Sequence, residues 1–284
     1  MKLVEAHVKD GATIKSTLTP RFRQMHEEDA CQKLRALDRK DVPQLALALL
    51  ARGTNGHGVA FEGDPDHVRS LLPKLFKKGG KELFLNEMPT GGFTYAELTT
   101  IPDVVFDEIP KLRKKHPFTE MTIWSAPLTD FPVRFGELAP FLRKLRIGWP
   151  DFTELPDAIC RCTNLEELEL HAYKLAELNP HITKLKKLKR LAVTHSKVMT
   201  QLPPEICELS WLEELDLGFM KTKLPKEIGN MKALTKLELQ SARGIRKLPP
   251  ELAQCTKLKV VNVRWSGVSP EAVKAILPKV KVES

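Results

Sequence analysis

Residues 155–170 read LPDAICRCTNLEELEL, and this stretch decides the fold. It ends in the pattern Leu-x-x-Leu-x-Leu at Leu165, Leu168 and Leu170, whose last two leucines share one face of an extended strand. It begins with Leu155-Pro156, where the fixed φ of proline suits the first turn of a short helical segment. One strand and one helical return are therefore predicted, a unit that cannot bury its apolar face alone.

The same strand pattern recurs along the chain at intervals of 22 to 24 residues between starting positions. The further units are Phe118/Met121/Ile123, Leu142/Leu145/Ile147, Leu188/Leu191/Val193, Leu212/Leu215/Leu217, Leu234/Leu237/Leu239 and Leu258/Val261/Val263. The return motif recurs between them as Phe131-Pro132, Leu202-Pro203, Leu224-Pro225 and Leu248-Pro249. Units in such regular register predict a stacked array in which each repeat covers its neighbour.

The pattern resembles the leucine-rich-repeat family, in its intracellular variety LPxxIxxLxxLxxLxL of about 23 residues per repeat, which Ras-suppressor-like and bacterial proteins share. The resemblance implies an α/β solenoid: a curved parallel β-sheet of about eight strands with helical or 3-10 return segments. One feature of the family is missing, the asparagine that bonds backbone groups in the turn after each strand. Its positions hold Ala126, Pro150, Tyr173, Ser196, Met220, Ala242 and Ser266, so we expect looser turns that contain more water.

Three regions are expected along the chain. Residues 1–79 form a helical N-terminal cap region, with amphipathic helices over 26–37, 41–51 and 66–77, although residues 1–25 show no pattern. The solenoid covers 80–268 and includes two longer, helix-bearing units with strands near Leu83 and Met121. Residues 269–284 form a C-terminal cap, a helix that Ser269 begins followed by a short strand, because terminal repeats would otherwise expose the core.

The bulk composition is that of an ordinary protein with 29% charged residues and a formal charge of +9. The basic excess is spread over the chain, which makes nucleic-acid binding unlikely. The first residues lack a signal-peptide pattern, and no apolar run is long enough for a membrane span. The five cysteines include no CxxC pair. These features favour a cytoplasmic location with reduced thiols, and secretion by a non-classical bacterial route stays open.

Groups that could support catalysis or metal binding are sparse. The glycine-rich stretch 53–58 lacks the GK[ST] of a phosphate loop. His171 and His195 lie on adjacent repeats but out of register, and Cys160-x-Cys162 has no second pair for zinc. We therefore expect no metal, no cofactor and no enzymatic activity. An enzyme, such as the ubiquitin ligases of some bacterial repeat proteins, would need a separate catalytic domain.

The outward-facing residues of the strands are the candidate binding site, because period-2 alternation gathers them on one concave face. The candidate partner-binding residues are Arg146, Glu167, Glu169, His171, Arg190, Glu214, Asp216, Glu238, Asn262 and Arg264, with rim aromatics Trp124, Trp149, Phe219 and Trp265. Exposed aromatic side chains beside charged ones are typical of binding hot spots. Five carboxylates at the centre of the strip predict a partner with a basic segment.

The expected function is therefore that of a protein-binding scaffold or adaptor. The family resemblance makes a small GTPase or its regulator a possible partner, and a non-catalytic effector-type protein acting on a host or regulatory partner is an alternative. A second alternative is binding of nucleic acid or an anionic surface through basic return-segment faces. The basic cluster there has no interleaved aromatics on which bases could stack; it consists of Lys184, Lys186, Lys187, Lys189 and Arg190.

Overall fold

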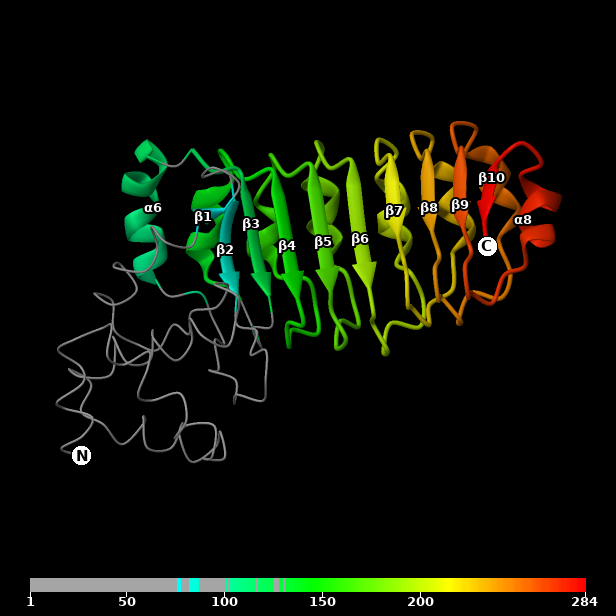
Figure 1. Ribbon diagram of the computed structural model, residues 1–284, viewed down its shortest axis with the longest axis horizontal. Helices are drawn as coiled ribbons and strands as arrows, with labels where there is room; N and C mark the ends of the chain where they lie inside the picture. The colour runs from blue at the N-terminus through cyan, green and yellow to red at the C-terminus, as the bar shows by residue number, and fades with distance from the viewer. Residues whose placement is uncertain are drawn as a thin grey trace, which may run out of the picture.

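A computed structural model describes residues 76–77, 82–86, 101, 103–115, 117–124, 128–129 and 131–284. Their strands form one open sheet in chain order from β1 to β10. All neighbouring strands from β2 to β10 pair in parallel, and the return segments lie behind them (Figure 1). The expected repeat solenoid is confirmed, and β2 to β9 are its eight expected parallel strands.

Each strand follows the predicted leucine register. The bounds are β2 Glu82–Asn86, β3 Glu120–Trp124, β4 Lys144–Gly148, β5 Glu167–His171, β6 Arg190–Thr194, β7 Glu214–Asp216, β8 Lys236–Glu238 and β9 Val260–Asn262. Leu145 of β4 pairs with Leu168 of β5, and Leu168 pairs with Leu191 of β6. All three are fully buried, as parallel in-register stacking requires.

The return segments are short, and a proline stands at the start of each one or directly before it. They are η3 Val133–Leu138, α7 Asp157–Cys160, η4 Pro180–Lys184, η5 Pro204–Glu208, η6 Lys226–Asn230 and η7 Pro250–Gln254. Except at η4, where Asn179 caps the segment, the residue before each one is a proline in extended conformation. One apolar residue of each segment, such as Ile159 or Ile206, is fully buried against the strand layer.

Both ends of the described array are covered (Figure 1). At one end lies α6 Asp103–Lys115, the helix of the second longer unit, whose Val105 and Phe106 are buried. At the other end lies α8 Pro270–Ile276, capped by the Ser269 hydroxyl, which accepts the Ala272 N–H at 3.2 Å. β10 Lys281–Glu283 then adds a parallel strand to β9.

The N-terminal prediction needs one correction. Phe76 and Lys77, expected to end a helix over 66–77, instead form β1 Phe76–Lys77, which pairs antiparallel with β2. A strand here satisfies hydrogen-bonding groups at the edge of β2 that a helix would leave unpaired. The remainder of that helix, the helices at 26–37 and 41–51, and residues 1–25 lie outside the described residues. Within the described part, no helix is long and apolar enough to cross a membrane.

The turn after β6 corrects a second expectation. Ser196, which stands where the family has asparagine, is fully buried. Its hydroxyl donates to the Leu175 carbonyl at 2.6 Å and accepts the Met199 N–H at 3.0 Å. The buried Ser196 hydroxyl therefore forms the hydrogen bonds of this turn in place of the asparagine side chain of the family, because a hydroxyl can both donate and accept.

Candidate functional site

The concave face is the sheet face opposite the return segments, and its outward-pointing residues lie in rows across the strands. The first row follows the pairing register, and from Glu120 to Lys236 it alternates in charge. It runs Glu120, Lys144, Glu167, Arg190, Glu214, Lys236 and Val260. Opposite charges one strand apart attract, so this row stabilises the stacking of the repeats.

Two arginines connect this row with the next one. Arg146 lies within 3.5–3.9 Å of carboxylate oxygens of Glu120, Glu167 and Glu169. Arg190 is placed in the same way, at 3.5–3.8 Å from Glu169, Glu214 and Asp216.

Each of the five central carboxylates therefore has a cation beside it, Glu238 through Lys236 Nζ at 2.6 Å. Because Arg146 and Arg190 are each shared among three carboxylates, the negative charge is partly relieved, as the sequence indicated. A basic segment in the partner stays a prediction.

The carboxylate side chains are also less exposed to solvent than the period-2 alternation suggested. Only 25% of the Glu169 side chain and 23% of the Asp216 side chain are exposed. Burial raises the pKa of Asp216, and its Oδ1 accepts the Gly218 N–H at 2.9 Å. Asn262 is buried, and its side-chain oxygen accepts the Arg264 N–H at 3.0 Å. These short side chains fold back on the strand ends, so they hold turns as well as face the concave side.

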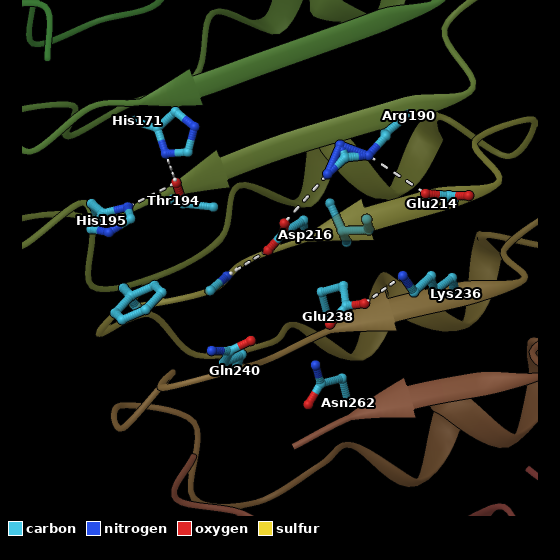
Figure 2. Close-up of a pocket in the computed structure, with 13 residues that line it drawn as sticks. His171, Arg190, Thr194, His195, Glu214, Asp216, Lys236, Glu238, Gln240 and Asn262 are labelled. Carbon is cyan, nitrogen blue, oxygen red and sulfur yellow. Dashed lines mark hydrogen bonds and ion pairs between the residues drawn. The ribbon is translucent and has the colours of Figure 1, made fainter. Parts of the chain in front are cut away.

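Two histidines meet at the end of β6. His171 pairs with Thr194 in the strand register, and the Thr194 hydroxyl lies 2.8 Å from His171 Nδ1 and 2.9 Å from His195 Nδ1. Figure 2 shows this threonine between the two rings. His171 Nε2 lies 2.7 Å from Glu169, and this hydrogen bond lowers the pKa of the Glu169 carboxyl.

No metal site results from this contact. Among the described residues, no group of three or more His, Cys, Asp or Glu side chains could hold a metal ion. Burial lowers the pKa of His195, with the charge of His171 as a second cause.

A hollow of about 350 Å³ lies over β6 to β9 and extends to His171 at the end of β5. Of the candidate residues, His171, Arg190, Glu214, Asp216, Phe219, Glu238 and Asn262 line it (Figure 2). Arg146, Glu167, Glu169 and Arg264 are on the same face but outside the hollow. His195, Lys236 and Gln240 also line it and were not among the candidates. For His195, the available signal was its position, which matches those of Trp149 and Phe219 in their repeats.

The rim aromatics occupy unusual backbone positions. Five residues have φ between 56° and 68°, and each stands four positions after the middle residue of its Leu-x-x-Leu-x-Leu pattern: Trp149, His195, Phe219, Ser241 and Trp265. This left-handed region favours glycine and costs a bulky residue about 1–2 kcal/mol. Trp149, Phe219 and Trp265 are nevertheless 40%, 47% and 67% exposed. The Trp124 side chain lies outside the described part.

The reactive side chains do not suggest covalent chemistry. Cys160, Cys162, Cys207 and Cys255 are buried free thiols. Burial raises the pKa of the first three to about 12 and that of Cys255 in the same direction. Such thiols stay protonated, and a protonated thiol is a poor nucleophile. The concave face offers charges, amides and ring faces, which are groups for binding.

A family model described as a leucine-rich repeat region matches residues 157–280. This stretch of the chain is therefore similar to leucine-rich repeat regions, and proteins that contain such regions commonly serve as protein-interaction scaffolds. The matched model describes a repeat region and no catalytic domain.

Among curated proteins, a probable serine/threonine-protein kinase, pats1, of Dictyostelium discoideum is 32% identical over 105 residues. That match covers 36% of this chain and 3% of the kinase, so the chain spans only a small part of this relative.

Two solved structures share the fold. The leucine-rich-repeat domain of the type III effector XopL is 16% identical with a TM-score of 0.51, covering 99% of this chain and 94% of that one. Internalin C2 of Listeria monocytogenes is 17% identical with a TM-score of 0.50, covering 66% of this chain and 76% of its own. At these identities the likeness concerns the fold alone.

Proposed function

We propose that this chain is a scaffold or adaptor that binds a protein partner on the concave face, centred on the hollow over β6 to β9. The observation that carries the proposal is the row of exposed aromatic side chains in left-handed backbone positions at the strand ends, of which Phe219 lines that hollow. Folding favours glycine at such positions, and Trp265, which is 67% exposed, buries little in return. Large, rigid aromatic side chains at an accessible edge are well suited to anchor a partner.

The concave charges support the proposal in a different way. Since Arg146 and Arg190 each bridge three carboxylates, the surface is preorganised before a partner arrives. A partner that fits these fixed groups loses less conformational freedom on binding, so the network favours selectivity.

The return-segment faces are the weaker candidate surface. Lys186 lies over the Trp211 ring at 4.3 Å, and Lys187 donates to Asn164 at 2.6 Å. Two cations of the basic cluster are thus already engaged, which disfavours nucleic-acid binding there. A cytoplasmic location, a small GTPase or its regulator as partner, and an effector-type role remain finer proposals.

Site-specific photo-crosslinking in the organism that supplies the chain tests the proposal. A photoreactive amino acid replaces Gln240, which lines the hollow, or in a matched control Lys186 on the return-segment side. We expect crosslinks to one or a few proteins from position 240 and few from position 186. Phe219→Gly, which removes the ring and suits the left-handed backbone, should weaken the crosslinks from 240. Equal crosslinking from both positions, or none from 240, would contradict the concave-face assignment.

A further inference from the structure

The turns that follow β6, β7, β8 and β9 carry positive charge only. Residues 195–201, 218–224, 239–249 and 263–268 contain no aspartate or glutamate. Lys197, Lys221 and Arg243 hold equivalent positions in three successive repeats, six residues after Leu191, Leu215 and Leu237. Lys223, Arg246, Lys247 and Arg264 complete the set, and all seven side chains are exposed. We name this set the cationic rim.

No salt bridge balances these charges within the described part of the chain, although Glu283 interacts electrostatically with Arg264. None of the seven forms an ion pair with a carboxylate there, whereas the equivalent Lys174 of the preceding repeat bonds Asp151 at 2.8 Å. Neighbouring strands are about 5 Å apart, so Lys197, Lys221 and Arg243 repel one another along the array. The first row of the sheet face avoids this cost by alternating its charges. Lys197 lies over the Tyr173 ring at 4.8 Å, a contact that stabilises this one cation but leaves it without a carboxylate partner. Folding therefore does not explain the row of cations as a whole.

The row of left-handed positions lies two residues before this row of cations. It presents His195, Phe219, Ser241 and Trp265 from β6 to β9. His195 and Phe219 stack at 4.5 Å with nearly parallel rings, and Arg264 lies 5.8 Å from the Trp265 ring centre. A ligand at this edge thus meets apolar ring surface beside exposed positive charge.

We infer that the cationic rim binds an acidic segment of the protein partner, one in which carboxylates alternate with apolar side chains. The inference rests on the proposed function and reverses the charge expected of the partner from the sequence. In an extended segment, successive side chains point to opposite sides, so carboxylates reach the cation row while apolar groups reach the rings. Complementary charge also accelerates encounter and selects against basic partners.

Single-stranded nucleic acid is the competing ligand, and the ring arrangement disfavours it. Stacked bases need open ring faces at successive positions. Here His195 and Phe219 cover one face of each other, and Ser241 supplies no ring at the next position. Carboxylates need only the cations.

Fluorescence anisotropy with three labelled probes tests the inference on the full chain. The probes are a twelve-residue peptide of alternating glutamate and valine, the same peptide with lysine for glutamate, and a twelve-nucleotide oligothymidylate. We expect the glutamate peptide to bind most tightly, and more weakly as salt screens the cations. The double variant Lys221→Glu/Arg243→Glu should lose about tenfold or more of that affinity. The matched control Lys186→Glu/Lys187→Glu changes net charge equally and should lose about twofold or less. Phe219→Asn removes the ring and introduces a residue that tolerates the left-handed backbone, so it should weaken binding of the glutamate peptide several-fold.

Three outcomes would overturn the inference. The glutamate peptide could fail to bind, both double variants could weaken it equally, or the oligothymidylate could bind more tightly and lose affinity only with the rim variant. The last result would assign the rim to nucleic acid. Circular dichroism of each variant confirms folding before binding is measured. Failure of the peptide test while position 240 still crosslinks a protein would leave the proposed function standing. Peptide binding without crosslinks from position 240 would support the cationic rim and contradict the proposed concave-face function.

Discussion

Phe219 has a φ of 61°, and this single angle predicts an unusual order of stabilities. Consider Phe219→Gly and Phe219→Ala side by side. Both variants lose the same ring and the same stack on His195, so their difference isolates the backbone. Alanine keeps the left-handed cost of about 1–2 kcal/mol, which glycine avoids. Glycine loses about 0.5–1 kcal/mol through the extra freedom of the unfolded chain. The glycine variant should therefore be the more stable of the two by roughly 1 kcal/mol.

Urea unfolding followed by circular dichroism measures this difference, with equal m-values required of the two variants. Ala176→Gly is the matched control, because Ala176 is exposed and its φ is not positive. There glycine should be the less stable residue by about 0.5–1 kcal/mol. If the alanine variant is the more stable of the two at position 219, the left-handed strain that supports the functional argument is not real.

Three further predictions concern the fold and its response to pH. Leu215→Ala and Leu191→Ala truncate fully buried strand residues and should each cost about 2–5 kcal/mol in urea unfolding; a loss under about half a kilocalorie would show the register to be wrong. Gly244→Ala would place a Cβ 2.3 Å from the Lys221 backbone and should lower the melting temperature, whereas Gly136→Ala, with its nearest neighbour at 3.7 Å, should barely change it; equal shifts would refute the close packing at 244. The pKa of His195 is lowered from 6.5, so just below pH 6.5 the unfolded chain binds more protons than the folded chain, and the free energy of unfolding should fall as pH drops through that window. In thermal melts His195→Gln should show a smaller fall. An unchanged fall would assign the effect to another group.

The strand register could be predicted almost completely from the sequence. Leu145, Leu168 and Leu191 define it because only one alignment buries every leucine, and a shift by one residue would expose them all. The C-terminal helix was predictable for a similar local reason, since Ser269 and Pro270 are strong start signals. The strand at Phe76 was not, because pairing with the edge of β2 overrides local helical preference.

The candidate site was only partly predictable. Period-2 alternation placed Glu169 and Asp216 on the concave face, but it contains no information on side-chain conformation. It therefore missed that Arg146 and Arg190 each reach three carboxylates and that Asp216 bonds its own turn. The left-handed φ of Phe219 was equally out of reach, because the residue that usually marks it, glycine, is absent there.

The four buried thiols of the described residues can report local unfolding of the repeats that contain them. Cys160 and Cys162 lie in the repeat before β5, Cys207 lies in η5 before β7, and Cys255 precedes β9, so three separate depths of the stack each contain a thiol. None can react with an alkylating reagent until its repeat separates from a neighbour, because the thiols are buried and held protonated. Timed alkylation followed by mass spectrometry would therefore show from which end the array begins to unfold, and it needs no substitution in the sequence.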